Sequence, residues 1–102
     1  MAAARRQADA APHDYILRLF VAGHTQKSLR AVRNITRVCE QHLSGHFDLE
    51  IVDVYQHPEK AVEYQLVAAP TLMKLSPPPA RRMVGDMSDS DRVLAGLGLA
   101  VG

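Results

Sequence analysis

The apolar positions in the first half of the chain change their spacing twice. Residues 15–22 (YILRLFVA) are rich in β-forming side chains and carry one charge, which predicts a central strand buried on both faces. Over residues 26–43 the apolar positions recur three and four apart, which predicts an amphipathic helix with Thr25 as its N-cap. The expected inner positions of this helix are Leu29, Val32, Ile35, Thr36, Cys39 and Leu43. Residues 47–54 predict a second strand, parallel to the first because a helix connects them.

The second half predicts a shorter helix, a hairpin and a final helix. The shorter helix is expected to begin at Pro58, with Val62 and Leu66 on its inner face. Residues 71–75 and 82–85 predict two strands that form a hairpin around the proline triplet. Ser88 is the expected cap of the last helix. Its core positions would be Val93, Leu94 and Leu97. Gly96 and Gly98 would weaken this helix by about 1 kcal/mol each relative to alanine.

The resulting order, β-α-β-α-β-β-α, predicts an α/β fold with a mixed sheet, which is the thioredoxin-like arrangement. The chain has 102 residues, of which 47% are hydrophobic, and a net charge of +1. These values favour one domain over residues 14–102, preceded by a disordered tail over residues 1–13. The alternative for the tail is a targeting peptide. Near-neutral charge argues against a nucleic-acid partner, and no apolar run approaches the ~20 residues of a membrane span.

The candidate chemistry in the sequence is sparse. A thioredoxin-like oxidoreductase needs a reactive cysteine at the start of the first helix, where this chain has Thr25 and Ser28. The single cysteine, Cys39, is expected in the core, and an unpaired thiol suits a cytoplasmic protein. His42 and His46 are separated by a helix-ending Ser-Gly pair, which disfavours a metal site. Because no catalytic constellation or phosphate-binding loop is present, we expect neither an enzyme nor a cofactor.

Several segments resemble the KaiB family, small clock proteins that bind the KaiC ATPase. The motifs A-x-P-T-L and P-P-P-x-R-R-x-x-G-D-x-S are specific in combination. The matching segments are residues 17–34, 47–59, 67–89 and 93–97. The chain is therefore identified as a member of this family. Its N-terminal extension, Gly98 where members commonly carry an acid, and the missing acidic C-terminal tail suggest a non-cyanobacterial or paralogous member.

The resemblance implies a non-enzymatic regulator that binds a KaiC-type ATPase ring and modulates its phosphorylation and ATPase cycle in circadian or similar timing. It also implies two folds. The thioredoxin-like state binds the ring, whereas the other state has a rearranged C-terminal half and is often tetrameric. A resting homo-oligomer, dimer or tetramer, is therefore expected, and KaiA or a SasA-like histidine kinase would be an indirect partner. The alternative function is a thioredoxin-like adaptor or sensor module in stress or two-component signalling.

The resemblance also implies where the partner binds. Arg30, together with Lys74, Arg81 and Arg82 around the proline turn, matches charged motifs that the family uses for partner binding. Arginine suits this role because its planar guanidinium binds carboxylates through two hydrogen bonds. Otherwise the basic residues of the first helix form an ordinary solvated face.

The residues implicated in fold switching lie in the second half. They are Pro70, expected to follow a cis peptide bond in the thioredoxin-like state, then Pro77, Pro78, Pro79, Gly96 and Gly98. X–Pro bonds isomerise over tens of seconds or longer, so the proline triplet is a candidate slow step if the fold switches.

Overall fold

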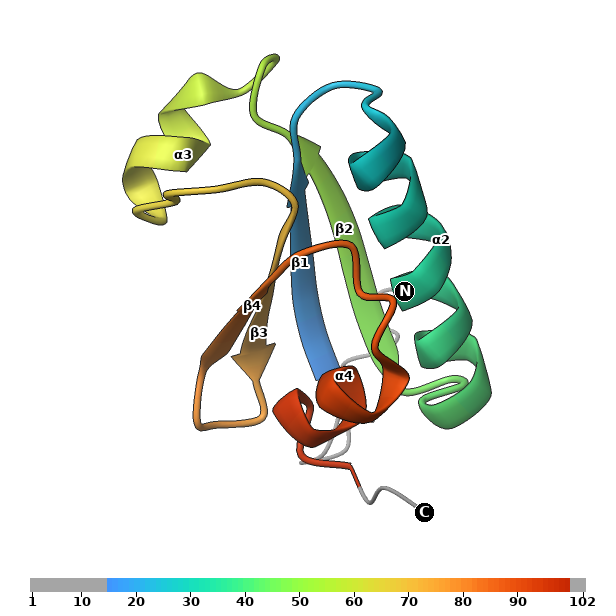
Figure 1. Cartoon of the computed structure of the whole chain (residues 1–102). Coiled ribbons are helices and arrows are strands. Elements are labelled where there is room, and N and C mark those ends of the chain that lie inside the picture. The colour runs from blue at the N-terminus through green and yellow to red at the C-terminus, as the bar shows by residue number, and fades with distance from the viewer. Residues whose placement is uncertain (1–14, 100–102) are drawn as a thin grey trace.

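A computed structural model describes residues 15–99 and contains the predicted order of elements (Figure 1). The expected N-terminal tail lies outside the described residues. The elements are β1 (Tyr15–Val21), α2 (Gln26–His42), β2 (Phe47–Asp53), α3 (Pro58–Glu63), β3 (Thr71–Ser76), β4 (Arg81–Val84) and α4 (Ser90–Gly96). In the described part of the chain, no helix is long and apolar enough to cross a membrane.

The four strands form one mixed sheet in the order β2-β1-β3-β4. β1 is parallel to β2, with Tyr15 opposite Phe47, as the connecting helix predicts. β3 is antiparallel to both β1 and β4, so the hairpin is also confirmed. β1 therefore lies between neighbours on both sides, which explains why its sequence is almost entirely apolar.

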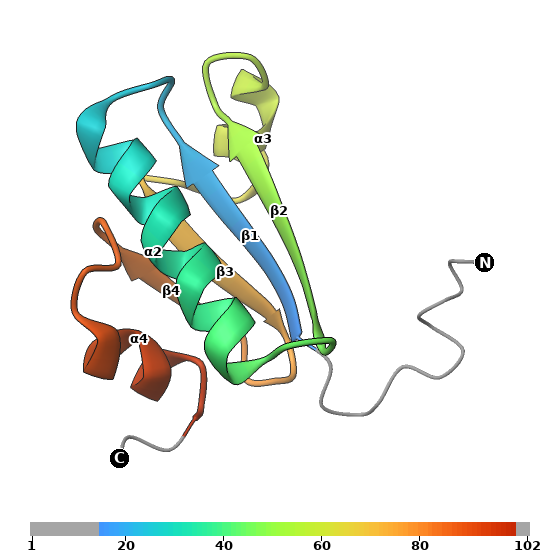
Figure 2. The same cartoon turned by 90° about the vertical axis from the view of Figure 1, so that its right-hand side faces the viewer.

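Helices α2 and α4 cover the same face of the sheet, as Figure 2 shows. On this face, alternate side chains of β1 pack against both helices, and Tyr15 donates a hydrogen bond from its hydroxyl to the Leu97 carbonyl oxygen at 2.9 Å. Gly96 of α4 has no side chain, and the Met83 sulfur of β4 occupies the space where a Cβ would stand. The main contributors from the helices are Ala31, Ile35, Val38, Cys39, Val93, Leu94 and Leu97.

The opposite face has a smaller core under α3. Phe20, Val52 and Met73 are buried there, and the Tyr64 ring lies 5.0 Å from that of Phe20. The prediction that Val62 faces inward is wrong, because its side chain is 78% exposed. α3 ends at Glu63, and the chain then turns so that Tyr64 and Leu66 contact the sheet instead. The expected inner position of Leu66 is thus confirmed.

The structure corrects two further details. Leu29 is 42% exposed, because the buried stripe of α2 runs through Ala31, Ile35 and Val38, and Leu29 lies on the other side of the helix. Asp89, not Ser88, caps α4, since its carboxylate accepts a hydrogen bond from the Arg92 amide at 3.2 Å. By contrast, the predicted Thr25 cap of α2 is confirmed.

The peptide bond between Ala69 and Pro70 is cis, as expected for this fold. The bonds that precede Pro77 and Pro79 are cis as well.

Candidate partner-binding surface

Two basic residues face each other across the β3–β4 hairpin. Lys74 lies opposite Arg81 in the ladder and opposite Leu17 on its other side, so it belongs to the sheet face that α2 and α4 cover. Lys74 is only 3% exposed, whereas Arg81 is exposed. Within residues 15–99, neither side chain has a hydrogen bond or an ion pair. Burial, and next the charge of Arg81, lowers the pKa of the Lys74 ammonium below its usual range.

Arg82 follows Arg81 in β4 and therefore lies on the opposite sheet face. Its guanidinium donates hydrogen bonds to the carbonyl oxygens of Tyr64, at 2.8 Å, and Gln65, at 3.0 Å. These carbonyls directly follow α3, where backbone acceptors lack partners within the helix. Arg82 thus fixes the end of α3 against the hairpin.

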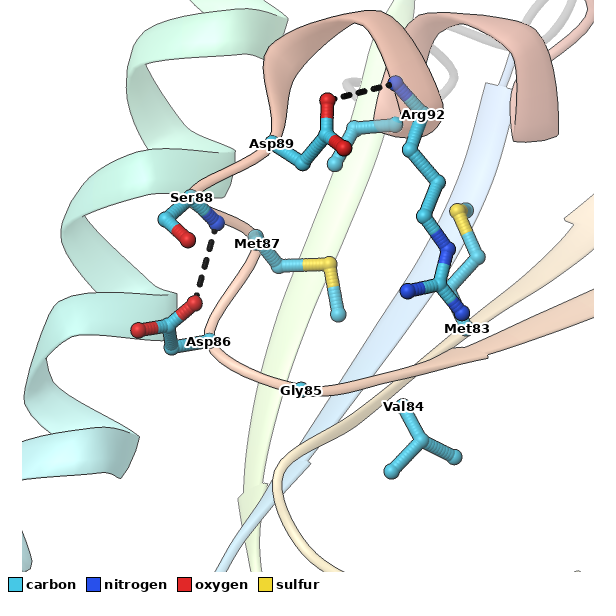
Figure 3. Close-up of a pocket in the computed structure, with 9 residues that line it drawn as sticks. Met83, Val84, Gly85, Asp86, Met87, Ser88, Asp89 and Arg92 are labelled. Atoms are coloured by element: carbon cyan, nitrogen blue, oxygen red, sulfur yellow. Dashed lines mark hydrogen bonds between the residues drawn. The ribbon is translucent and has the colours of Figure 1, made fainter.

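Arg30 is held within the molecule by a second contact, which we call the Asp86 clasp (Arg30, Asn34 and Asp86). The Arg30 Nε donates to Asp86 Oδ2 at 3.1 Å, and the Asn34 side-chain amide donates to the Asp86 backbone carbonyl at 2.9 Å. Asp86 also accepts a hydrogen bond from the Ser88 amide (Figure 3). Hydrogen bonds from the Ser88 side chain and from Arg30 lower the pKa of the Asp86 carboxyl. The clasp connects α2 to the loop between β4 and α4.

The structure therefore brings together two of the four predicted contact residues. Lys74 and Arg81 are cross-strand neighbours, Arg82 lies beside them on the other face, and Arg30 lies in the Asp86 clasp. Sequence reasoning missed the contact that Arg30 and Asn34 of α2 make with Asp86. Asp86 is 56 residues from Arg30, and no local spacing signals a contact over that distance.

A small pocket lies between β4, the following loop and α4. In Figure 3 the Arg92 side chain extends toward Met83, and Met87 points into the same space. Asp86 and Asp89 on the rim already accept backbone hydrogen bonds. The pocket therefore presents thioether and guanidinium groups, together with the Ser88 hydroxyl that bonds Asp86. Among residues 15–99, no three histidine, cysteine or acidic side chains form a cluster that could hold a metal ion.

The start of α2 uses its hydroxyl groups for structure. Thr25 Oγ1 accepts a hydrogen bond from the Ser28 amide at 3.1 Å, and Ser28 Oγ accepts one from the Ala22 amide at 3.2 Å. Cys39, the only cysteine of the sequence, is fully buried, and burial raises the pKa of its thiol to about 12. Thiol–disulfide exchange requires a thiolate, so the burial of Cys39 makes it poorly suited to that reaction.

Solved structures with the same fold include thioredoxins and the N-terminal domain of SasA. The germline-specific thioredoxin Deadhead of Drosophila melanogaster is 16% identical, with a TM-score of 0.66 over 93% of this chain and 91% of its own. The N-terminal domain of Synechococcus elongatus SasA is 25% identical, with a TM-score of 0.62 over 92% of each chain. The thioredoxin-like fold is thus confirmed.

Sequence comparison is more specific. The KaiB domain family model matches residues 18–99. The circadian clock oscillator protein KaiB of Nostoc sp. strain PCC 7120 is 45% identical over 83% of this chain and 79% of its own. The protein of the same name from Synechococcus sp. strain CC9311 is 46% identical over 83% of this chain and 71% of its own. The family match spans nearly all of the described structure and includes every basic residue discussed above, and so the chain belongs to the KaiB family.

Proposed function

We propose that this protein is a non-enzymatic clock regulator that docks on a KaiC-type ATPase ring and modulates its phosphorylation and ATPase cycle. Membership of the KaiB family supports the clock role. The observation that carries the docking proposal is Arg81, an exposed guanidinium with no partner among the described residues. The partner would contribute carboxylates to this site, because a guanidinium binds them through two hydrogen bonds.

The four basic residues contribute differently to this proposed surface. Arg81 contacts the partner directly, and Lys74, opposite it in the ladder, adds positive charge to this site in its protonated form. Arg82 and Arg30 use part of their guanidinium groups inside the molecule and offer their remaining N–H groups to the partner. Arg81 is therefore the position where a substitution changes docking without changing an internal contact.

The docking proposal is tested by titrating a KaiC-type hexamer, with ATP, against Arg81→Ala. We expect affinity to fall by about tenfold, as for one well-placed interface arginine. The matched control is Arg33→Ala, which removes the same charge from the exposed side of α2. Unchanged affinity for Arg81→Ala, or an equal loss in both variants, would refute this site.

The resting state is a separate part of the proposal. We place the protein in the cytoplasm as a dimer or tetramer whose C-terminal half is rearranged, in exchange with the thioredoxin-like state described here. KaiA or a SasA-like kinase would then be affected indirectly, through the ring. Light scattering coupled to size-exclusion chromatography tests this, since a stable monomer at all concentrations contradicts it.

A second candidate function is a sensor or adaptor module. The likeness to the SasA N-terminal domain favours it, because that domain has the same fold at 25% identity. The titration with a KaiC-type hexamer distinguishes the two candidate functions. A regulator of the ring binds the isolated hexamer, whereas an adaptor that acts elsewhere does not.

A further inference from the structure

Lys74 differs from the other lysines of this protein. The sequence has three, of which Lys27 is exposed and Lys60 forms an ion pair with Glu63 at 3.4 Å. Lys74 is 3% exposed and has neither a carboxylate nor a hydrogen-bond acceptor among the described residues. Its cross-strand neighbour Arg81 carries a charge of the same sign. Like charges directly opposite each other destabilise a sheet. A negative group between Lys74 and Arg81 would remove this repulsion.

The repulsion between Lys74 and Arg81 is removed when the Lys74 ammonium loses its proton. A buried, unpaired ammonium favours its neutral form, and the lowered pKa of Lys74 has this cause. A neutral amine is a nucleophile, and each unit by which a pKa falls raises the free-amine fraction about tenfold at a pH below it. Carbon dioxide is the smallest electrophile that such an amine meets in a cell, and it is apolar enough to enter a covered site.

We propose that Lys74 is a site of reversible carbamate formation by carbon dioxide, and that Arg81 binds the carbamate. The Nζ lone pair forms the new N–C bond, and one C=O π pair moves to oxygen. The nitrogen then releases one proton to solvent, which leaves an N-linked carboxylate. No oxidation or reduction occurs, and loss of carbon dioxide after reprotonation reverses the step.

The setting of Lys74 suits the product as well as the reaction. The carbamate has two oxygens in one plane, which is the geometry that a guanidinium binds through two hydrogen bonds. The modification gives Lys74 a negative charge, so that it can form an ion pair with Arg81 across the β3–β4 ladder. Arg81 lies on an edge strand and is exposed, so the guanidinium that would bind the carbamate borders water.

The test uses the full chain in buffer equilibrated with ¹³C-labelled carbon dioxide. Carbamate is detected by ¹³C NMR, trapped by alkylation with a trialkyloxonium salt, and located by peptide mass spectrometry. Lys27 and Lys60 serve as internal controls. We expect the trapped adduct on Lys74 to exceed that on either control lysine several-fold. Equal labelling of the three lysines, or no label on Lys74, overturns the proposal.

Two variants separate the roles of the pair. Lys74→Met keeps the length and apolar character of the side chain and should abolish the adduct. Arg81→Ala changes an exposed residue, so the fold should persist, and the adduct on Lys74 should fall several-fold. Arg33→Ala removes the same charge elsewhere and should leave the adduct unchanged. An undiminished adduct in Arg81→Ala refutes the proposed carbamate binding by Arg81.

Carbamate formation would also place a negative charge beneath the proposed docking surface. That consequence rests on the proposed function, and it predicts weaker binding of a KaiC-type ring at high carbon dioxide. The labelling experiment contains no ring, so failure of the docking proposal leaves its result intact.

Discussion

Gly98, which follows the C-cap of α4, has a backbone conformation that other residues adopt only at a cost in free energy. Its φ is +80°, and the amides of Gly98 and Leu99 donate to the carbonyls of Ala95 and Leu94. This pair of hydrogen bonds is the Schellman motif, in which glycine is favoured just after the helix. The residue that the sequence identifies as a departure from its family is thus a structural stop signal in this fold.

We predict that Gly98→Ala lowers the free energy of unfolding by about 1–2 kcal/mol, the cost of a left-handed conformation for an ordinary residue. Gly98→Asn should cost less, because asparagine tolerates this conformation. Urea denaturation measures both. Equal stability of the alanine variant and the unchanged protein would show that α4 ends differently in solution.

Asp86 gives the stability a specific pH dependence. The hydrogen bonds from Ser88 and Arg30 lower its pKa in the folded protein relative to about 3.9 in the unfolded chain. The folded state therefore gains stability above the unfolded pKa, and loses it as the pH falls through the lower folded value. We expect Asp86→Asn to flatten the acid side of the stability–pH curve, measured by urea denaturation in steps below about pH 5.

The control for this prediction is Asp48→Asn, an exposed carboxylate without a hydrogen bond or ion pair in the described part of the chain. The control should retain the acid limb of the unchanged protein. Two identical curves for the two variants would assign the acid dependence to other groups.

At the level of elements, α3 depends on contacts outside itself. It has six residues, none of them buried, which is too short for a stable isolated helix. Its position depends on Tyr64, which packs against Phe20, and on Arg82, which bonds the carbonyls of Tyr64 and Gln65.

We predict that Arg82→Ala frays α3 and costs about 1 kcal/mol of stability, since it removes hydrogen bonds from a charged donor at an exposed site. Amide hydrogen exchange should accelerate at Tyr64 and Leu66 and remain unchanged in α2. Arg82→Lys keeps the charge but lacks the two-pronged donor, so it should resemble alanine. Full protection in the lysine variant would mean that charge alone fixes α3.

The elements themselves were predictable because their signals are local. Residues 15–22 have the composition of a buried strand, and the spacing in residues 26–43 is helical. The errors concern contacts between elements. Val62 fits a helical spacing, but α3 ends at the next residue and buries none of its side chains against the sheet. Ser88 and Asp89 are both good caps, and only the path of the loop decides between them.

For the molecule as a whole, the two halves of the chain, residues 15–53 and 58–99, join through the β1–β3 ladder and a shared apolar core. The Asp86 clasp, the ring contact between Phe20 and Tyr64 and the bond from Tyr15 to the Leu97 carbonyl also cross this boundary. The N-terminal half contains the 17-residue α2, whereas β4 has four residues and α4 seven. The second half is therefore the weaker cooperative unit.

We predict that native-state hydrogen exchange separates these halves. Amides of β4 and α4 should exchange through partial opening, at a lower free energy than amides of β1 and α2. Such an opening is also what a rearranged C-terminal half requires. Uniform protection across both halves would show that the molecule opens only as one unit.

The candidate surface was less accessible to sequence reasoning than the fold. The four basic residues stand out by charge and motif, but burial separates Lys74 from its exposed neighbour Arg81. The internal bonds of Arg30 and Arg82 depend on residues 56 and 18 positions away, which only the folded chain brings close.

The burial of Cys39 makes its thiol a natural chemical reporter of core opening. Its thiol lies in the core with a pKa of about 12, so reagents that modify thiolates cannot reach a reactive form in the closed molecule. Because it is the single thiol of the sequence, the rate of its modification counts openings of the core without an introduced label. A chromogenic disulfide reagent could therefore follow, in the unmodified protein, how often binding partners or conditions expose the α2 side of the sheet.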